Sequence, residues 1–135
     1  MAVFGLPLKS SLDATNAASC ALEITKQIAL SNAESGAITP TRIAIGIHYG
    51  EVVQGDIGSD KQLEFTAIGD VVNLASRIED YCRTIDAAIL VTDEVIQALL
   101  KEGSLELAAS FNDDGEHLIR GYEKPVHLFS VMRLP

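Results

Sequence analysis

The pattern of apolar and polar positions predicts several strands separated by helices. Residues 41–50 alternate, with isoleucines on one face and small residues on the other, which is typical of a central strand covered on both sides. Residues 88–91 form an apolar run that predicts a second buried strand. Further strands are expected at residues 1–7 (the end of a buried strand), 64–68, 105–111, 116–119 and 126–132, with a turn at 112–115.

Three segments have the spacing of amphipathic helices. The first begins at Ser10 or Ser11 and ends before a loop at residues 32–40. A third, short helix follows Thr92, whose hydroxyl is expected to cap it. The apolar stripe of the first helix is rich in alanine, which permits close approach to a sheet; it comprises Ala14, Ala17, Ala21, Ile24 and Ile28.

The second helix follows a break at Gly69, with Asp70 expected to cap its first turn. Its apolar stripe runs from Val71 to Cys82. Asn73 and Arg77 lie four residues apart and share another face. An amide beside a guanidinium suits a ligand with phosphate oxygens. On spacing alone, however, a solvated polar face is the favoured interpretation.

Composition narrows the classes of partner. The chain has 135 residues, which suits one domain, and a formal net charge of -9. Such a surface repels nucleic acid and anionic membranes, so a nucleotide ligand would need a few placed cations or a metal ion. We expect no membrane-spanning segment and no signal peptide, which makes the cytoplasm the default compartment.

Single residues are assigned structural roles first. Cys20 and Cys82 are expected to be buried thiols, because the sequence contains no CxxC pattern and no cluster of cysteines and histidines. His48 is expected to be a core or hydrogen-bonded histidine, and Gly46 to let another backbone come close. Residues 50–61 form a glycine-rich arm without a P-loop pattern, whose valines and isoleucine (Val52, Val53 and Ile57) would suit a dimer contact if exposed.

Four stretches together resemble the catalytic domain of class III nucleotidyl cyclases, the adenylate and guanylate cyclases. They are residues 2–7, 45–58, 64–77 and 119–126, and the resemblance covers nearly all of the chain. It implies an α+β, ferredoxin-like nucleotide cyclase fold, with a mostly antiparallel sheet covered by helices. Residues 1–135 would form the C-terminal portion of one such domain, lacking its first strands.

The resemblance also implies a reaction. Family domains pair head to tail, and two ions, Mg²⁺ or Mn²⁺, help the ribose 3′-hydroxyl of ATP or GTP attack the α-phosphate and release pyrophosphate. By position, Asn73 would orient the ribose and Arg77 would stabilise charge on the phosphate. Thr66 would help to select the purine, which favours ATP over GTP, and Arg120 would contact the terminal phosphates.

The family's two metal-binding aspartates and its purine-selecting lysine would precede Met1. Asp56, Asp60 and Asp70 do not match those positions, so we assign no metal ligand and expect this chain to be inactive alone. A longer chain that supplies the aspartates is expected to be active, and to be crippled by Arg77→Ala. The missing strand should open a sheet edge, which favours a homodimer or a rearranged sheet.

Two functions remain open for the chain. It is a fragment of an adenylate cyclase that makes cyclic AMP from ATP in the intact parent, or a catalytically inactive cyclase-homology module that dimerises or regulates. Asn73, Arg77 and Thr66 favour an active lineage, because an inactive module has no chemical need for that set. A ferredoxin-like domain of unrelated role would require the motif matches to be accidental.

Overall fold

A four-stranded sheet forms the centre of the molecule, with strand order β1-β4-β6-β5. The computed structural model describes residues 1–36, 38–57 and 64–133. β1 (Ile45–Ile47) runs parallel to β4 (Ala87–Thr92), whereas β6 (Val126–Met132) is antiparallel both to β4 and to β5 (Asn112–His117). The expected mostly antiparallel sheet of an α+β protein is therefore confirmed.

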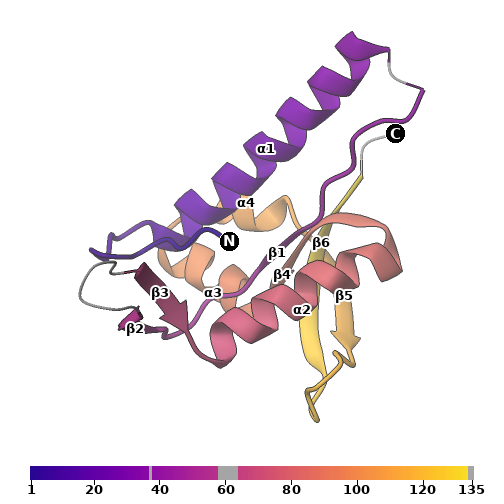
Figure 1. Cartoon of the computed structure of the whole chain (residues 1–135). Coiled ribbons are helices and arrows are strands. Elements are labelled where there is room, and N and C mark those ends of the chain that lie inside the picture. Colours follow the sequence, from indigo (N-terminus) through magenta and orange to yellow (C-terminus); the bar gives the residue numbers. More distant parts are fainter. Residues whose placement is uncertain (37, 58–63, 134–135) are drawn as a thin grey trace.

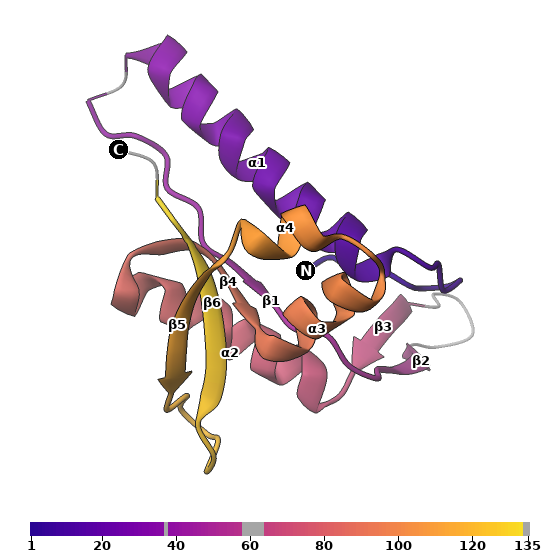
Figure 2. The same cartoon turned by 180° about the vertical axis from the view of Figure 1, so that it is seen from behind.

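Helices cover both faces of this sheet (Figures 1 and 2). α2 (Asp70–Ile85) packs on one face, where Leu74, Ile78 and Cys82 meet Leu90 of β4 and Leu128 of β6. The other face is covered by α1 (Asp13–Ser35), α3 (Asp93–Lys101) and α4 (Leu105–Ala109). Every residue of β4 is buried, as the continuous apolar run predicts for a strand covered on both sides.

β1 is shorter than predicted and lies at an edge of the sheet. Only residues 45–47 of the expected strand 41–50 are strand, and β4 is the neighbour of β1 within the described sheet. Ile45 and Ile47 pack toward the α1 side, and Gly46 faces α2. The apolar pattern on both faces of β1 thus reflects coverage by helices above and below the sheet. It does not require a neighbouring strand at both edges of β1.

Gly46 is the point at which α2 comes closest to the sheet. A Cβ atom built there would lie 2.5 Å from the carbonyl oxygen of Ala75 and 2.9 Å from Cα of Glu79. Both atoms belong to the helix backbone, which cannot move aside as a side-chain end can. The predicted close approach at Gly46 is therefore confirmed.

The glycine-rich arm forms a separate two-stranded antiparallel ribbon. β2 (Val53–Ile57) pairs with β3 (Glu64–Ile68), and the register places Gly55 opposite Thr66. The side chains of both strands lie outside the described part of the structure, and so does Asp60. Among the three apolar residues considered for a dimer contact, only Val52 has a described side chain, and it is half-buried.

Several other predicted segments differ from the structure. Residues 1–7 form no strand with any described segment, and Met1, Val3 and Phe4 are exposed. Residues 105–109 are helix α4, because Leu, Glu and Ala are strong helix formers whose alternation here imitates a strand. Residues 112–115 belong to β5, where Gly115 (φ 77°) occupies a β-bulge, and β5 ends at His117 instead of running to Ile119.

α1 begins and ends later than predicted and is held mainly by its N-terminal half. It continues to Ser35 and ends at Gly36, which has the left-handed conformation (φ 59°) common after a helix. Its buried residues are Ala14, Ala18 and Ala21, whereas Ile24 is 41% exposed. The C-terminal half of α1 extends past the sheet (Figure 1), so its apolar positions are not covered as predicted.

The N-terminus of α1 is capped by a residue from the end of α3. The Glu102 carboxylate accepts hydrogen bonds from the backbone N–H groups of Ala14 (3.0 Å) and Thr15 (2.8 Å). It also accepts one from the Thr15 hydroxyl at 2.6 Å. The helix has no side-chain cap from its own N-cap residue, Leu12. Glu102 therefore satisfies free amides that the local sequence leaves without a cap.

Replacing Glu102 by glutamine is expected to lower the free energy of unfolding by about 1–2 kcal/mol, as for loss of an N-cap. The amide group offers one acceptor oxygen where the carboxylate offers two, and it lacks the charge that interacts with the helix dipole. Urea denaturation followed by circular dichroism measures the change. Glu123→Gln, at an exposed position in the β5–β6 connection, is the charge-matched control. Equal stability of the two variants would contradict the capping role.

The two cysteines differ. Cys82 is buried as predicted, and burial raises the pKa of its thiol to about 11. Cys20 is exposed, because it lies outside the alanine stripe that faces the sheet. The prediction of a buried thiol is thus confirmed for Cys82 and wrong for Cys20.

Candidate functional site

α2 begins one residue earlier than a cap at Asp70 would require. Gly69 is the N-cap, with a φ of 145° that favours glycine, and Asp70 is the first helical residue. The Asp70 side chain makes no cap hydrogen bond, so the predicted cap is wrong. Its carboxylate still lies in the first turn, where a negative charge interacts favourably with the helix dipole.

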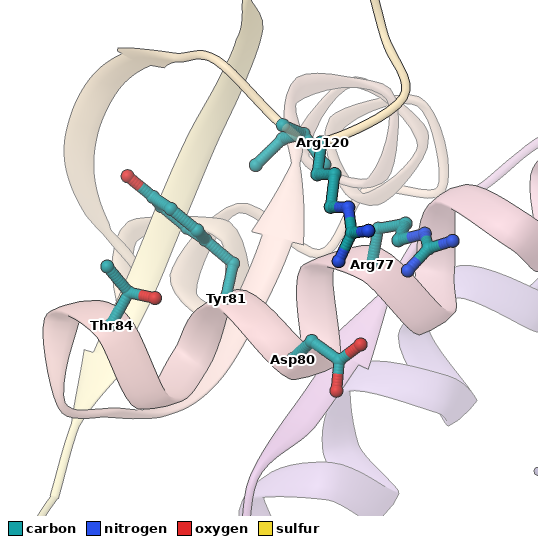
Figure 3. Close-up of a pocket in the computed structure, with 6 residues that line it drawn as sticks. Arg77, Asp80, Tyr81, Thr84 and Arg120 are labelled. Atoms are coloured by element: carbon teal, nitrogen blue, oxygen red, sulfur yellow. The ribbon is translucent and has the colours of Figure 1, made fainter.

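Two arginines from distant parts of the chain meet beside α2. Arg77 lies on the exposed face of the helix, and Arg120 lies in the connection between β5 and β6. Both line a pocket of about 200 Å³ (Figure 3). In Figure 3 the Arg120 side chain extends from the hairpin toward α2, and the Arg77 guanidinium extends away from Tyr81 and Thr84. The remaining lining residues are Asp80, Tyr81, Thr84 and Ile119.

Contacts between α2 and the β5–β6 hairpin fix the position of Arg120. The neighbouring Ile119 is buried in the cluster that contains Leu74 and Ile78 of α2. The Tyr122 hydroxyl donates a hydrogen bond to the backbone oxygen of Asp70 at 3.3 Å. Arg120 therefore lies between two residues that are anchored to the helix carrying Arg77.

A tyrosine–histidine pair adds a third connection on the other side of the pocket. The Tyr81 hydroxyl lies 3.1 Å from Nδ1 of His117, and Nε2 of His117 lies 3.0 Å from the backbone oxygen of Asp114. Because a carbonyl only accepts, Nε2 carries the ring hydrogen, and Nδ1 accepts a hydrogen bond from the Tyr81 hydroxyl. The two rings also meet edge to face, at 5.4 Å between centroids.

The pocket concentrates positive charge on an acidic protein. Among the described side chains, neither Arg77 nor Arg120 has an ion-pair or hydrogen-bond partner. A guanidinium stays protonated at any physiological pH and matches the geometry of phosphate oxygens. Two such groups lining one pocket can bind a polyphosphate, although the whole chain carries a net charge of -9.

The other two predicted site residues, Asn73 and Thr66, are not among the described residues that line the pocket. Asn73 is exposed on α2, one turn before Arg77, and does not line the pocket. Thr66 lies in β3, and its side chain lies outside the described residues. Sequence reasoning missed Asp80, Tyr81 and Thr84, although helical spacing from Arg77 places all three on the same side of α2.

The described residues offer no donor set for a metal ion. They contain no group of three or more His, Cys, Asp and Glu side chains that could bind one. They also include no helix with the length and hydropathy needed to cross a bilayer.

His48 has the structural role that was expected. Its Nδ1 lies 2.8 Å from the Thr92 hydroxyl, and burial lowers the pKa of its imidazole, an effect that nearby Glu94 partly offsets. Thr92 is the N-cap residue of α3 as predicted, but its side chain makes no cap hydrogen bond. The predicted hydroxyl cap is thus wrong, because the hydroxyl pairs with His48.

Comparison with known proteins agrees with the cyclase resemblance. The family model described as "Adenylate and Guanylate cyclase catalytic domain" matches residues 1–132. Adenylate cyclase 1 of Rhizobium meliloti is 32% identical over 97 residues, 70% of this chain and 15% of that protein. The terminal-differentiation specific adenylate cyclase of Dictyostelium discoideum is 27% identical over 124 residues, 90% of this chain and 6% of that protein.

Solved structures show the same fold. The adenylyl cyclase CyaB from P. aeruginosa superposes with a TM-score of 0.74 at 26% identity, over 98% of this chain and 66% of that one. The guanylyl cyclase Cya2 gives a TM-score of 0.72 at 28% identity, over 98% and 64% of the two chains. The chain therefore has the α+β nucleotide cyclase fold and spans only a small part of the curated relatives that it matches. It belongs to the family of adenylate and guanylate cyclase catalytic domains.

Proposed function

We propose that this chain is part of a domain that converts ATP to cyclic AMP and pyrophosphate, and that it supplies the phosphate-binding side of the active site. The observation that carries the proposal is that two arginines from distant parts of the chain, Arg77 and Arg120, line one pocket. The similarity to several adenylate cyclases supports a cyclase. The guanylyl cyclase Cya2 is similarly related, so the choice of ATP rests on the resemblance at Thr66.

The residues would act mainly by positioning charge. Arg77 would stabilise the negative charge that develops on the attacked phosphate, and Arg120 would hold the terminal phosphates. Asn73, one turn along the same face of α2, would orient the ribose, and Thr66 would contribute to purine choice. Because Arg120 lies beside the buried Ile119 and near Tyr122, which bonds to α2, the two cations need little rearrangement when a polyphosphate enters the pocket.

Family members use Mg²⁺ or Mn²⁺ to activate the 3′-hydroxyl and bind the triphosphate. The described residues do not fit that requirement, since they hold no cluster of ligands. We therefore propose that this chain forms no cyclic AMP by itself with either ion. Pairing of two copies, the arrangement that the family implies, is part of the same proposal.

Equilibrium binding tests the proposal on the chain as it is. ATP is expected to bind more tightly than GTP, and adenosine to bind too weakly to detect, because the phosphates provide most of the attraction. Isothermal titration measures all three ligands, and an assay with Mg²⁺ or Mn²⁺ in the same samples is expected to show no cyclic AMP. Adenosine binding as tight as that of ATP would contradict the phosphate site, and cyclic AMP formation would contradict the proposed inactivity.

The alternative is a cyclase-homology module that dimerises or regulates without catalysis. The half-covered α1 favours an additional contact surface, because Ile24 and Leu30 of that helix are exposed. An absence of ATP binding together with a stable dimer in light scattering would favour this module. ATP binding by the wild-type chain that is lost in an Arg77 variant would favour the catalytic lineage.

A further inference from the structure

A carboxylate shares the pocket with the two arginines. Asp80 follows Arg77 by three residues on α2, so both side chains project from the same side of the helix. It lines the same 200 Å³ pocket, and Figure 3 shows its carboxylate on the side of the pocket where the two guanidinium groups lie. Tyr81 and Thr84 occupy the other end.

The Asp80 carboxylate has no partner among the described side chains. It forms no ion pair with Arg77 or Arg120, and no hydrogen bond to any described side chain. The preceding carboxylate, Glu79, differs in this respect, because it pairs with Arg83 at 3.3 Å and lies outside the pocket. Asp80 therefore places a negative charge where a polyphosphate would bind.

We propose that Asp80 sets the affinity of the pocket for polyphosphate by opposing the attraction of Arg77 and Arg120. The inference rests on the proposed function, since it concerns the same site. A bound phosphate group is attracted by the two guanidinium charges and repelled by the negative charge of Asp80. The negative charge of Asp80 also offsets part of the positive potential that the two arginines create in the pocket, which lowers the attraction felt by an entering anion.

Such a counter-charge has a clear use in an enzyme whose product is pyrophosphate. Two unopposed arginines would hold the leaving pyrophosphate as firmly as they hold the triphosphate. Slow release of product limits turnover in many enzymes. By weakening both complexes, Asp80 favours departure of the product at the expense of ground-state binding.

The test compares inorganic pyrophosphate binding to the wild-type chain with binding to Asp80→Asn and Asp80→Ala, in buffer of low ionic strength. Isothermal titration is expected to show about two- to fivefold tighter binding in both variants, the range expected for an exposed charge pair. The gain should shrink as salt is added, because salt screens exposed charges. Asp114→Asn is the matched control, since it makes the same charge change at an exposed position outside the pocket.

Affinities of both Asp80 variants that equal the wild type, fall below it, or change no more than that of Asp114→Asn would overturn the role of Asp80. Arg77→Ala in the same series separates the two ideas. Weaker binding in Arg77→Ala with no effect at Asp80 would reject this inference and leave the phosphate site standing. An absence of pyrophosphate binding in every variant would reject the site and the inference together. Thermal melting of each variant verifies that Asp80, an exposed residue, is not needed for folding.

Discussion

Arg77→Ala is expected to weaken ATP and pyrophosphate binding by about tenfold, the low end for loss of a charged hydrogen-bonding partner. The guanidinium projects from the solvent-facing side of α2 and is free of described partners, so its removal should leave the fold intact. The loss is expected to come from the lost attraction to the ligand, because Arg77 has no ion pair or hydrogen bond with any described side chain. Isothermal titration at fixed salt measures the change, and circular dichroism verifies the fold.

Arg83→Ala provides the control for this prediction. Arg83 lies on the same helix and carries the same charge, but it pairs with Glu79 and does not line the pocket. Its removal should change polyphosphate binding little. Arg77→Lys should recover only part of the affinity, because an ammonium keeps the charge and lacks the planar fork. If Arg83→Ala and Arg77→Ala weakened binding equally, net charge and not the pocket would explain the effect.

Gly46→Ala is expected to reduce the free energy of unfolding by about 2–3 kcal/mol, which is large for a single added methyl group. The new Cβ would lie 2.5 Å from the carbonyl oxygen of Ala75, a backbone atom of α2. Relief requires the whole helix to move away from β1, which would loosen the buried contacts of Leu74 and Ile78. Urea denaturation measures the loss. An unchanged dependence of the free energy of unfolding on urea concentration would show that the variant differs in stability and not in the surface exposed on unfolding.

Gly50→Ala is the matched control at the other end of the same segment. A Cβ at Gly50 would approach Cγ2 of Val71 at 2.7 Å, but this is the end of a side chain that can rotate. Its cost should be about 1 kcal/mol or less. Similar losses in the two glycine variants would mean that α2 can shift as readily as a valine side chain, contrary to the packing described above.

The sequence pattern was most informative where burial and local periodicity coincide. The apolar spacing from Val71 to Cys82 located α2 correctly, and β6 has the predicted bounds, 126–132. It was misleading where a short segment suits two structures. Residues 105–109 alternate as a strand does, yet they consist of good helix formers and fold as α4. The Asp-Gly turn signal at 114–115 marks a β-bulge, because bulges and turns use the same glycine conformation.

The candidate site could be predicted only in part. Arg77 stood out through its helical relation to Asn73, and Arg120 only through the resemblance to a family. Their meeting in one pocket depends on how the β5–β6 hairpin docks on α2, which in turn depends on Ile119, Tyr122 and the His117–Tyr81 pair. Contacts of this kind join segments that are far apart in the sequence, so local periodicity does not report them. The Glu102 cap of α1 and the hydrogen bond between Thr92 and His48 were missed for the same reason.

The cationic pocket on an acidic chain has a kinetic consequence. A polyphosphate approaching from bulk solvent first meets the repulsion of a net charge of -9, and feels the attraction of Arg77 and Arg120 only at short range. At physiological ionic strength the screening length is about 8 Å, so the distant repulsion fades before the contact attraction does. Moderate salt should thus raise the association rate, because it screens the long-range repulsion. It should also raise the dissociation rate, because it weakens the attraction in the pocket.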